Sequence, residues 1–188
     1  MVTSNSNINP KKNFDDRYNS KGLESIYEFN KIYKSYKGVL REFEPVIFSL
    51  KELLNLNEED FHNLVIIMTE AFNNAVSHGN NYNQDREVEV NILVFPINLD
   101  LNKNIISDSL ESNCKEIGNK TKVVKITITD EGDGFDMEKI EDPREPKNLL
   151  KDGGRGVFLI KELSSSITYN LNQINNKNLN TLQIYFEY

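Results

Sequence analysis

The sequence predicts an α+β protein, a two-layer sandwich in which helices cover one face of a mainly antiparallel mixed sheet. Two observations predict this class. A stretch from about Glu58 to Ser77 has its apolar residues at helical spacing, and most predicted strands follow one another along the chain instead of alternating with helices. With 188 residues, of which 38% are hydrophobic, the chain suits one domain with a sizeable core.

The first 57 residues are predicted to contain a tail, a strand and a helix. Residues 1–20 are rich in Asn, Ser, Lys and Asp, so we expect a flexible tail before a domain that spans residues 21–188. Aromatic and polar residues alternate loosely from Ser25 to Ser35, which favours a strand. Pro45 fits the first turn of a helix that continues to about Leu54.

The helix expected from Glu58 to Ser77 has a broad apolar face that would build the core. That face contains Phe61, Leu64, Val65, Met68, Ala71, Phe72, Ala75 and Val76. Glu70 and Asn74 lie on the opposite side, with Ile66 and Ile67 beside them, which is unusual for a face that only meets water. We therefore expect another part of the protein to cover this side of the helix.

Alternating apolar residues predict the remaining strands. Residues 88–94 and 124–130 alternate strictly, and the second run ends at Asp130. The polar stretch over residues 98–121 is long for a hairpin connection, so we expect a surface insertion between these two strands. A short helix over residues 157–163 and a hairpin formed by residues 167–171 and 182–188 are predicted to complete the chain.

Composition excludes several classes of protein. The net charge of −7 lacks the basic footprint that nucleic-acid-binding proteins need, and it favours a basic or neutral protein surface as partner. The N-terminus has no apolar signal core, and the chain has no apolar run of about 18 residues, so we expect neither secretion nor membrane insertion. The single cysteine, Cys114, fits a reducing compartment, and the sequence therefore predicts a cytoplasmic protein.

A carboxylate and an amide form the first candidate site. Glu70 and Asn74 are about one helical turn apart and can point into one cleft. Mg²⁺ takes few protein oxygens together with phosphate oxygens, so the Asn74 amide oxygen suits Mg²⁺ held against a triphosphate. Glu70 is then a candidate general base for an attacking hydroxyl. Taken alone, the pair is more typical of a solvated helix face, and His78, one turn further, is either a helix-end residue or a ligand contact.

An acidic residue followed by glycines forms the second candidate site. Asp130 closes a strand, and its carboxylate could accept a hydrogen bond from an exocyclic amine such as that of adenine. Gly132 and Gly134 would allow the close approach of a ligand. The alternative for this motif alone is an acidic turn after a strand.

Glycines before a short helix form the third candidate site. Gly153, Gly154 and Gly156 precede an apolar helix, an arrangement in which bare amides and a helix N-terminus meet a phosphate. Arg155 could touch the γ-phosphate, face a protein partner or lie in solvent. The charged, proline-containing segment over residues 137–152 is either a lid over a nucleotide or a plain surface connection.

These three boxes, read in chain order, resemble the N, G1 and G2 boxes of the GHKL (Bergerat) ATPases, over about residues 25–188. Within that superfamily, the runs TEAFNNAVSHG at residues 69–79 and GGRGVFLI at residues 153–160 are most similar to the anti-sigma factor serine/threonine kinases. The resemblance implies a Bergerat fold with ATP between helices and sheet. It also implies that Asp130 contacts adenine, that Asn74 holds Mg²⁺ and that Glu70 activates the attacking hydroxyl.

The resemblance further implies the partners. Proteins of this kind bind a sigma factor and phosphorylate a serine or threonine of a small antagonist with a STAS domain; a homodimer is compatible with the sequence. The insertion at residues 98–121 and the N-terminal tail depart from the compact family pattern and leave the identity of the partner open. Two alternatives to a kinase are a nucleotide-gated binding module without transfer activity and a detached catalytic domain of a histidine kinase.

Overall fold

The computed structural model describes residues 24–97, 121–134, 143–144, 155–174 and 177–188. Its strands are β1 (Tyr27–Lys34), β2 (Glu87–Pro96), β3 (Lys122–Asp130), β4 (Ser166–Ile174) and β5 (Lys177–Glu187). Its helices are α2 (Leu40–Leu54), α3 (Glu58–Asn73), the π-helical turn η1 (Asn74–Gly79) and α5 (Arg155–Leu163). The predicted tail and insertion, and most of the segment between the second and third boxes, lie outside the described residues.

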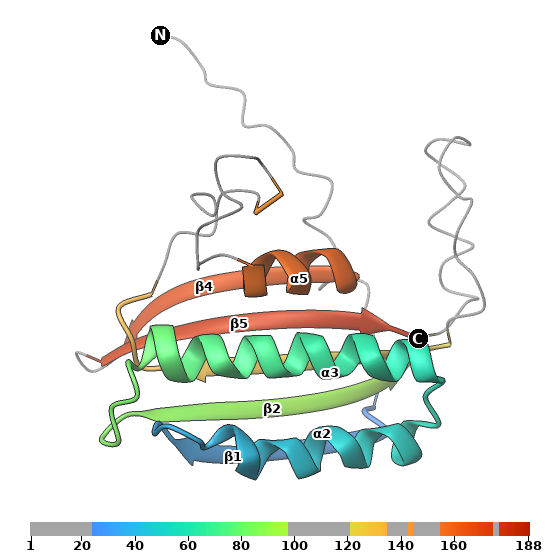
Figure 1. The fold of residues 1–188 in the computed structure, drawn as a ribbon. Coiled ribbons are helices and arrows are strands. Elements are labelled where there is room, and N and C mark those ends of the chain that lie inside the picture. Colours follow the sequence, from blue (N-terminus) through green and yellow to red (C-terminus); the bar gives the residue numbers. More distant parts are fainter. Residues whose placement is uncertain (1–23, 98–120, 135–142, 145–154, 175–176) are drawn as a thin grey trace, which may run out of the picture.

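One sheet contains all five strands, in the order β1-β2-β3-β5-β4, and each neighbouring pair is antiparallel (Figure 1). The predicted mainly antiparallel α+β architecture is therefore confirmed. β2 and β3 pair directly, and the Ile97 amide donates to the carbonyl of Thr121 at 2.7 Å. The residues that flank the segment 98–120 on either side are therefore neighbours at the end of this strand pair. β3 lies in the middle of the sheet and ends at Asp130.

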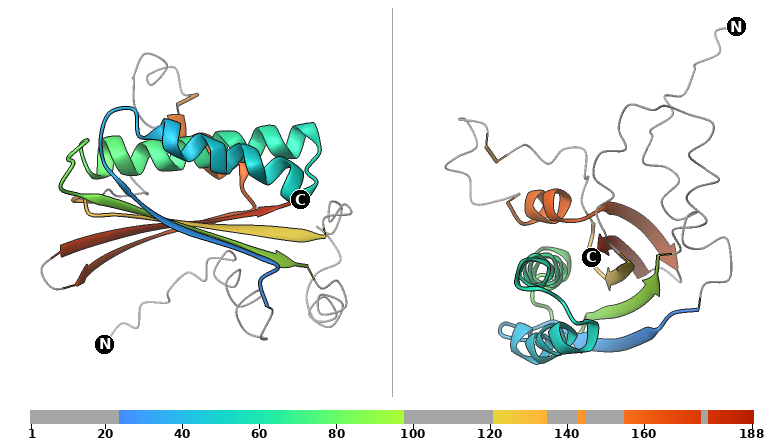
Figure 2. Two further views of the ribbon diagram at one scale, coloured as in Figure 1. Left: turned by 90° about the horizontal axis from the view of Figure 1, so that it is seen from below. Right: turned by 90° about the vertical axis from the view of Figure 1, so that its right-hand side faces the viewer.

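The helices α2, α3 and α5 lie on the same face of the sheet (Figure 2). The core between the two layers contains fully buried residues from each, among them Phe43, Leu64, Met68, Phe72, Ile92, Ile126 and Ile184. Burial of one such side chain contributes about 1.5–3 kcal/mol to stability. Apolar residues at every second position of the strands and at helical spacing in the helices meet on this one face of the sheet. No described helix is long and apolar enough to span a membrane.

α3 is covered on the side of Glu70 as well as on its core face. Ile67, three residues before Glu70, is completely buried, and so is Ile160 of α5, the helix that packs beside α3 in Figure 1. The expectation that another part of the protein covers this side is confirmed. α5 therefore packs on the side of α3 that carries Glu70.

The helix start predicted near Pro45 was wrong, because α2 begins at Leu40. The buried residues Phe43, Ile47, Leu50 and Leu54 keep helical spacing across the proline, and their burial outweighs the loss of the one backbone hydrogen bond that Pro45 cannot donate. The Pro45 ring is exposed to solvent. Asn55 ends the helix in the left-handed conformation, with φ of 52°.

The last turn of the helix predicted to Ser77 differs from a regular α-helix. α3 ends at Asn73, and the chain continues as the π-helical η1, in which the Asn80 amide donates to the carbonyl of Ala75 at 2.8 Å. The predicted start is confirmed, because the Asn57 side chain accepts a hydrogen bond from the Asp60 amide at 2.8 Å. Short π-helical segments are often found at functional sites, and this one begins at Asn74.

Candidate functional site

The first and third boxes meet where α3 passes α5. Glu70 and Asn74 are half-buried on α3 and η1, and Gly156 is the second residue of α5. A Cβ atom placed on Gly156 would lie 2.4 Å from Glu70 Oε2 and 3.4 Å from Asn74 Nδ2. The absence of a side chain at Gly156 therefore provides the space in which the Glu70 carboxylate lies, beside the Asn74 amide.

The Asn74 amide is available to a ligand. Its Nδ2 atom is buried and has no hydrogen-bond partner within the part of the chain that the structure describes. A buried amide without partners costs roughly 1–3 kcal/mol, so a bound group that engages this side chain would recover free energy. Because the oxygen and nitrogen of an amide can exchange places by a flip, the same side chain can present its oxygen to a cation. In the described residues, no group of three or more His, Cys, Asp and Glu side chains could hold a metal ion.

The second box centres on a buried carboxylate at the end of β3. Asp130 is 8% exposed, and its Oδ1 accepts hydrogen bonds from the Gly132 amide and from Asn180 Nδ2, both at 2.9 Å. Burial raises the pKa of Asp130, whereas these two donors and the positive charge of Arg86 oppose the rise. Oδ2 accepts no hydrogen bond from any other described residue, which leaves an acceptor for a ligand.

Two glycines bring the end of η1 against the second box. A Cβ atom on Gly79 would lie 2.5 Å from the Asp130 carboxyl carbon, and a Cβ atom on Gly132 would lie 2.1 Å from the Gly79 carbonyl oxygen. Gly134 has a φ of +76°, a conformation that other residues rarely adopt. The first and second boxes are therefore in direct contact, and this contact leaves no room for a side chain at Gly79 or Gly132.

The structure does not bring every predicted site residue together. Gly153 and Gly154 lie outside the described residues. Arg155 is exposed at the first residue of α5. His78 is exposed on η1, and no hydrogen bond or ion pair within the described ranges joins it to Glu70 or Asp130. The roles of these four residues therefore stay predictions.

Sequence analysis missed two asparagines that hold the second box in place. Asn180 of β5 donates from Nδ2 to Asp130 Oδ1 and to the Gly132 carbonyl, both at 2.9 Å. Asn80, completely buried, donates to Ser35 Oγ and to the Glu87 carbonyl, both at 2.8 Å, and accepts from the Glu131 amide at 2.9 Å. For Asn180 a signal existed, because it occupies a core-facing position of a strand whose next core-facing residues are Leu182, Ile184 and Phe186.

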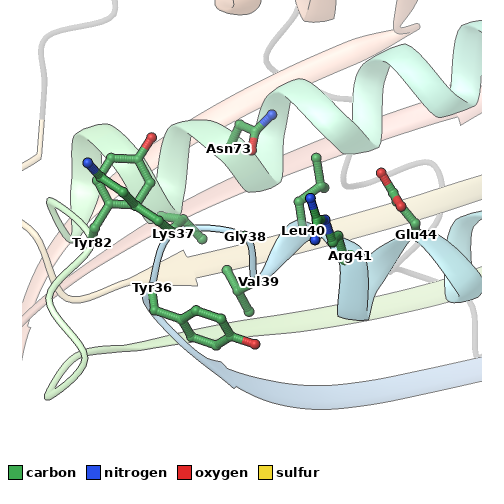
Figure 3. Close-up of a pocket in the computed structure, with 10 residues that line it drawn as sticks. Tyr36, Lys37, Gly38, Val39, Leu40, Arg41, Glu44, Asn73 and Tyr82 are labelled. Atoms are coloured by element: carbon green, nitrogen blue, oxygen red, sulfur yellow. The ribbon is translucent and has the colours of Figure 1, made fainter.

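A separate pocket of about 300 Å³ lies beside α2. Figure 3 shows side chains around it, which include Lys37 of the loop between β1 and α2, Arg41 of α2, Asn73 of α3 and Tyr82. None of the predicted site residues lines it, although Asn73 and Val76 of the first box do. Asn73 borders this pocket, whereas Asn74 lies beside Gly156, so the two faces of this helix turn serve different spaces.

The chain is similar in sequence to known proteins. The chain is 28% identical to a protein named serine-protein kinase RsbW from Oceanobacillus iheyensis over 141 residues, which are 72% of each chain. It is 30% identical over 116 residues, 58% of each chain, to proteins of the same name from two strains of Staphylococcus aureus. Residues 39–185 match the family described as histidine kinase-like ATPase domain. This match covers most of the chain and all three boxes, and the chain therefore belongs to the histidine kinase-like ATPase domain family.

Proposed function

We propose that this protein is an ATP-dependent serine/threonine protein kinase that acts as an anti-sigma regulatory factor. The observation that carries the proposal is the meeting of Glu70, Asn74 and Gly156, which places a carboxylate beside an amide whose nitrogen has no partner among the described residues, against bare backbone. Family membership and the names of the relatives support the same activity. The proposed substrate is a STAS-domain antagonist, and the proposed sequestered partner is a sigma factor.

The residues present fit ATP and Mg²⁺. The Asn74 amide would hold Mg²⁺, which supplies positive charge to the phosphates when bound. The partnerless nitrogen of that amide is the observation in favour, because no protein acceptor fixes the orientation of the amide and a flip can turn its oxygen toward a cation. Asp130 would accept the adenine amine, and the backbone around Gly156 would border the phosphates.

Glu70 would act on the proton of the substrate protein. Its carboxylate accepts the proton of the serine or threonine hydroxyl while the hydroxyl oxygen bonds to the γ-phosphorus and the bond from that phosphorus to ADP breaks. Because Gly156 leaves room for the Glu70 carboxylate beside the Asn74 amide, base and metal ligand can serve one reacting centre. Asn74 and Asp130 would bind and orient Mg²⁺ and the nucleotide, and they exchange no proton.

Two other functions use the same cleft. A nucleotide-gated binding module without transfer activity would need Asp130 and Asn74 but would have no use for the Glu70 carboxylate. A detached histidine kinase domain would pass phosphate to histidine, and phosphohistidine is acid-labile whereas phosphoserine and phosphothreonine are acid-stable. The Glu70 carboxylate, a group that can accept a proton, favours transfer over binding alone, and the names of the relatives favour serine as the acceptor.

The test is phosphoryl transfer by a Glu70→Gln variant. Purified chain, Mg²⁺ and γ-labelled ATP are incubated with a STAS-domain protein from the same organism. We expect acid-stable label on that protein, a rate about 10²–10⁴-fold lower for E70Q, and unchanged ATP affinity. Glu59→Gln, on an exposed glutamate at the start of α3, is the matched control and should keep the wild-type rate. Wild-type chain that binds ATP but labels no protein would refute the kinase proposal.

A further inference from the structure

Asn180 is the buried polar residue of β5 that touches the second box. It is 2% exposed, and β5 pairs with β3 so that Asn180 lies opposite Asp130. Its amide nitrogen donates to Asp130 Oδ1 at 2.9 Å and to the carbonyl oxygen of Gly132 at 2.9 Å. One side chain on one strand therefore holds both the carboxylate and the turn that follows it.

We propose that Asn180 is a positioning residue that sets base specificity, by orienting the Asp130 carboxylate so that its free oxygen accepts the amino group of adenine. This proposal rests on the proposed function, because it requires the cleft to bind ATP. The geometry separates the two oxygens of the carboxylate. Oδ1 is occupied by the Gly132 amide and by Asn180 Nδ2, whereas Oδ2 accepts no hydrogen bond from any other described residue.

The orientation decides which base can bind. An ionised carboxylate accepts hydrogen bonds and cannot donate them, so it pairs with the exocyclic amine of adenine and repels the carbonyl oxygen of hypoxanthine or guanine. A protonated carboxyl can donate, and it would lose this discrimination. Base selection therefore depends on an oriented, ionised carboxylate in a site that is otherwise shielded from water.

The neighbours of Asp130 give Asn180 this influence. Burial raises the pKa of Asp130, and the Asn180 amide is the first of the groups that lower it, followed by the Gly132 amide and the charge of Arg86. From η1 the contact is made by Gly79, which has no side chain. The adjacent Glu131 is paired with Lys177 at 2.7 Å, so its charge is compensated locally. Removal of the Asn180 amide would thus raise the pKa of Asp130 further.

The test measures dissociation constants of the full chain for ATP and for ITP, the hypoxanthine analogue, from about pH 5 to about pH 9. The variants are Asn180→Ala, which removes the amide, and Asn180→Asp, which keeps the shape and replaces the donor by a second carboxylate. Asn170→Ala, at an exposed asparagine of the neighbouring strand β4, is the matched control. Thermal unfolding of each variant without nucleotide reports whether it is folded.

For wild type and N170A we expect preference for ATP and little change of affinity across neutral pH. For N180A we expect ATP affinity about 10–100-fold weaker, with the loss greatest at the acid end of the range, where Asp130 takes up a proton first, and a smaller ratio of ATP to ITP affinity. N180D should lose more than N180A, because two adjacent carboxylates share a proton and the pKa of the pair rises.

Wild-type specificity and pH dependence in N180A would overturn the proposal. An equal loss for ATP and ITP at every pH, accompanied by a lower unfolding temperature, would do the same, since it would assign Asn180 a structural role only. If N180D fails to fold, the nucleotide affinities of N180A alone decide between these outcomes. A wild-type chain that binds neither nucleotide would overturn the proposed function itself, an outcome that differs from intact ATP binding with unaltered variants.

Discussion

Gly156→Ala places a single methyl group at the point where the first and third boxes meet. The added Cβ atom would lie 2.4 Å from Glu70 Oε2, closer than the 3.0 Å that real Cβ atoms keep from their neighbours. The obstructing atom is the end of a flexible side chain, so the Glu70 carboxylate can swing away while the backbone stays in place. The substitution therefore moves the proposed base and little else.

The size of the effect follows from this geometry. To restore 3.0 Å the carboxylate oxygen must move by at least about 0.6 Å, and a displacement of about 1 Å at a reacting centre costs on the order of 10²-fold in rate. Alanine is also favoured over glycine inside a helix by about 1 kcal/mol, which offsets the contact in α5. We expect phosphoryl transfer to fall about 10²-fold while the unfolding temperature stays within about 3 °C of wild type.

The assay is transfer of label from ATP at saturating concentration, measured for G156A, E70Q and the double variant. If the methyl group acts through Glu70, the double variant should be no slower than E70Q, because the displaced group has already lost its function. A G156A rate equal to wild type would refute the reasoning. So would a double variant in which the two losses multiply, since Gly156 would then act independently of Glu70.

Two further predictions concern the second box. For Gly132→Ala, the Cβ atom would lie 2.1 Å from the Gly79 carbonyl, a backbone atom, so we expect about 1–3 kcal/mol lower stability in urea unfolding as well as weaker ATP binding; wild-type stability would contradict the close approach. For Asp130→Asn, removal of a buried charge should abolish ATP binding yet raise the free energy of unfolding at pH 7 by about 1 kcal/mol.

The pH dependence of D130N gives the sign of the Asp130 contribution. Burial raises the pKa of Asp130 above its value in the unfolded chain, so ionisation costs stability above that pKa. The stability gain of D130N should therefore shrink as the pH falls through the raised pKa of Asp130, and it should vanish below about pH 3, where the carboxyl is protonated in the unfolded chain as well. A gain that is constant with pH would show that the buried charge is not its cause.

Hydrophobic periodicity was sufficient to predict most elements of the fold. The strict alternation of residues 88–94 and 124–130 predicted β2 and β3, because one face of each strand is buried and the other is not. Periodicity failed where it competed with another local signal. Pro45 suggested a helix start, but apolar residues on both sides of it are buried together, and α2 begins at Leu40.

The candidate site was predictable in its residue types but not in its contacts. The spacing of Glu70 and Asn74 placed them on one helix side, whereas their approach to Gly156 depends on how α5 packs against α3. The contact of Asn180 with Asp130 could not be predicted from sequence, because the pairing of β3 with β5 across 50 residues sets the two residues opposite each other. Tertiary contacts of this kind leave only a weak local signal, here an asparagine at a core-facing strand position.

The π-helical end of α3 explains how one segment serves two spaces. η1 starts at Asn74 beside the candidate nucleotide cleft and ends at Gly79 against Asp130. On its other side, Val76 and the preceding Asn73 border the pocket beside α2. The wider π-helical turn sets the direction in which Val76 and the residues after it point. In a regular α-helix to Ser77 these side chains would be rotated away from their present positions beside the pocket and Asp130.

The most direct test of the central claim is a crystal structure of the chain with Mg²⁺ and a non-hydrolysable ATP analogue. Our account predicts adenine with its amino group on Asp130 Oδ2, Mg²⁺ on the Asn74 amide oxygen, and the Glu70 carboxylate beside Gly156 without metal. Nucleotide in the pocket beside α2, among Lys37, Arg41 and Tyr82, would contradict it, because the three boxes would then not form the binding site.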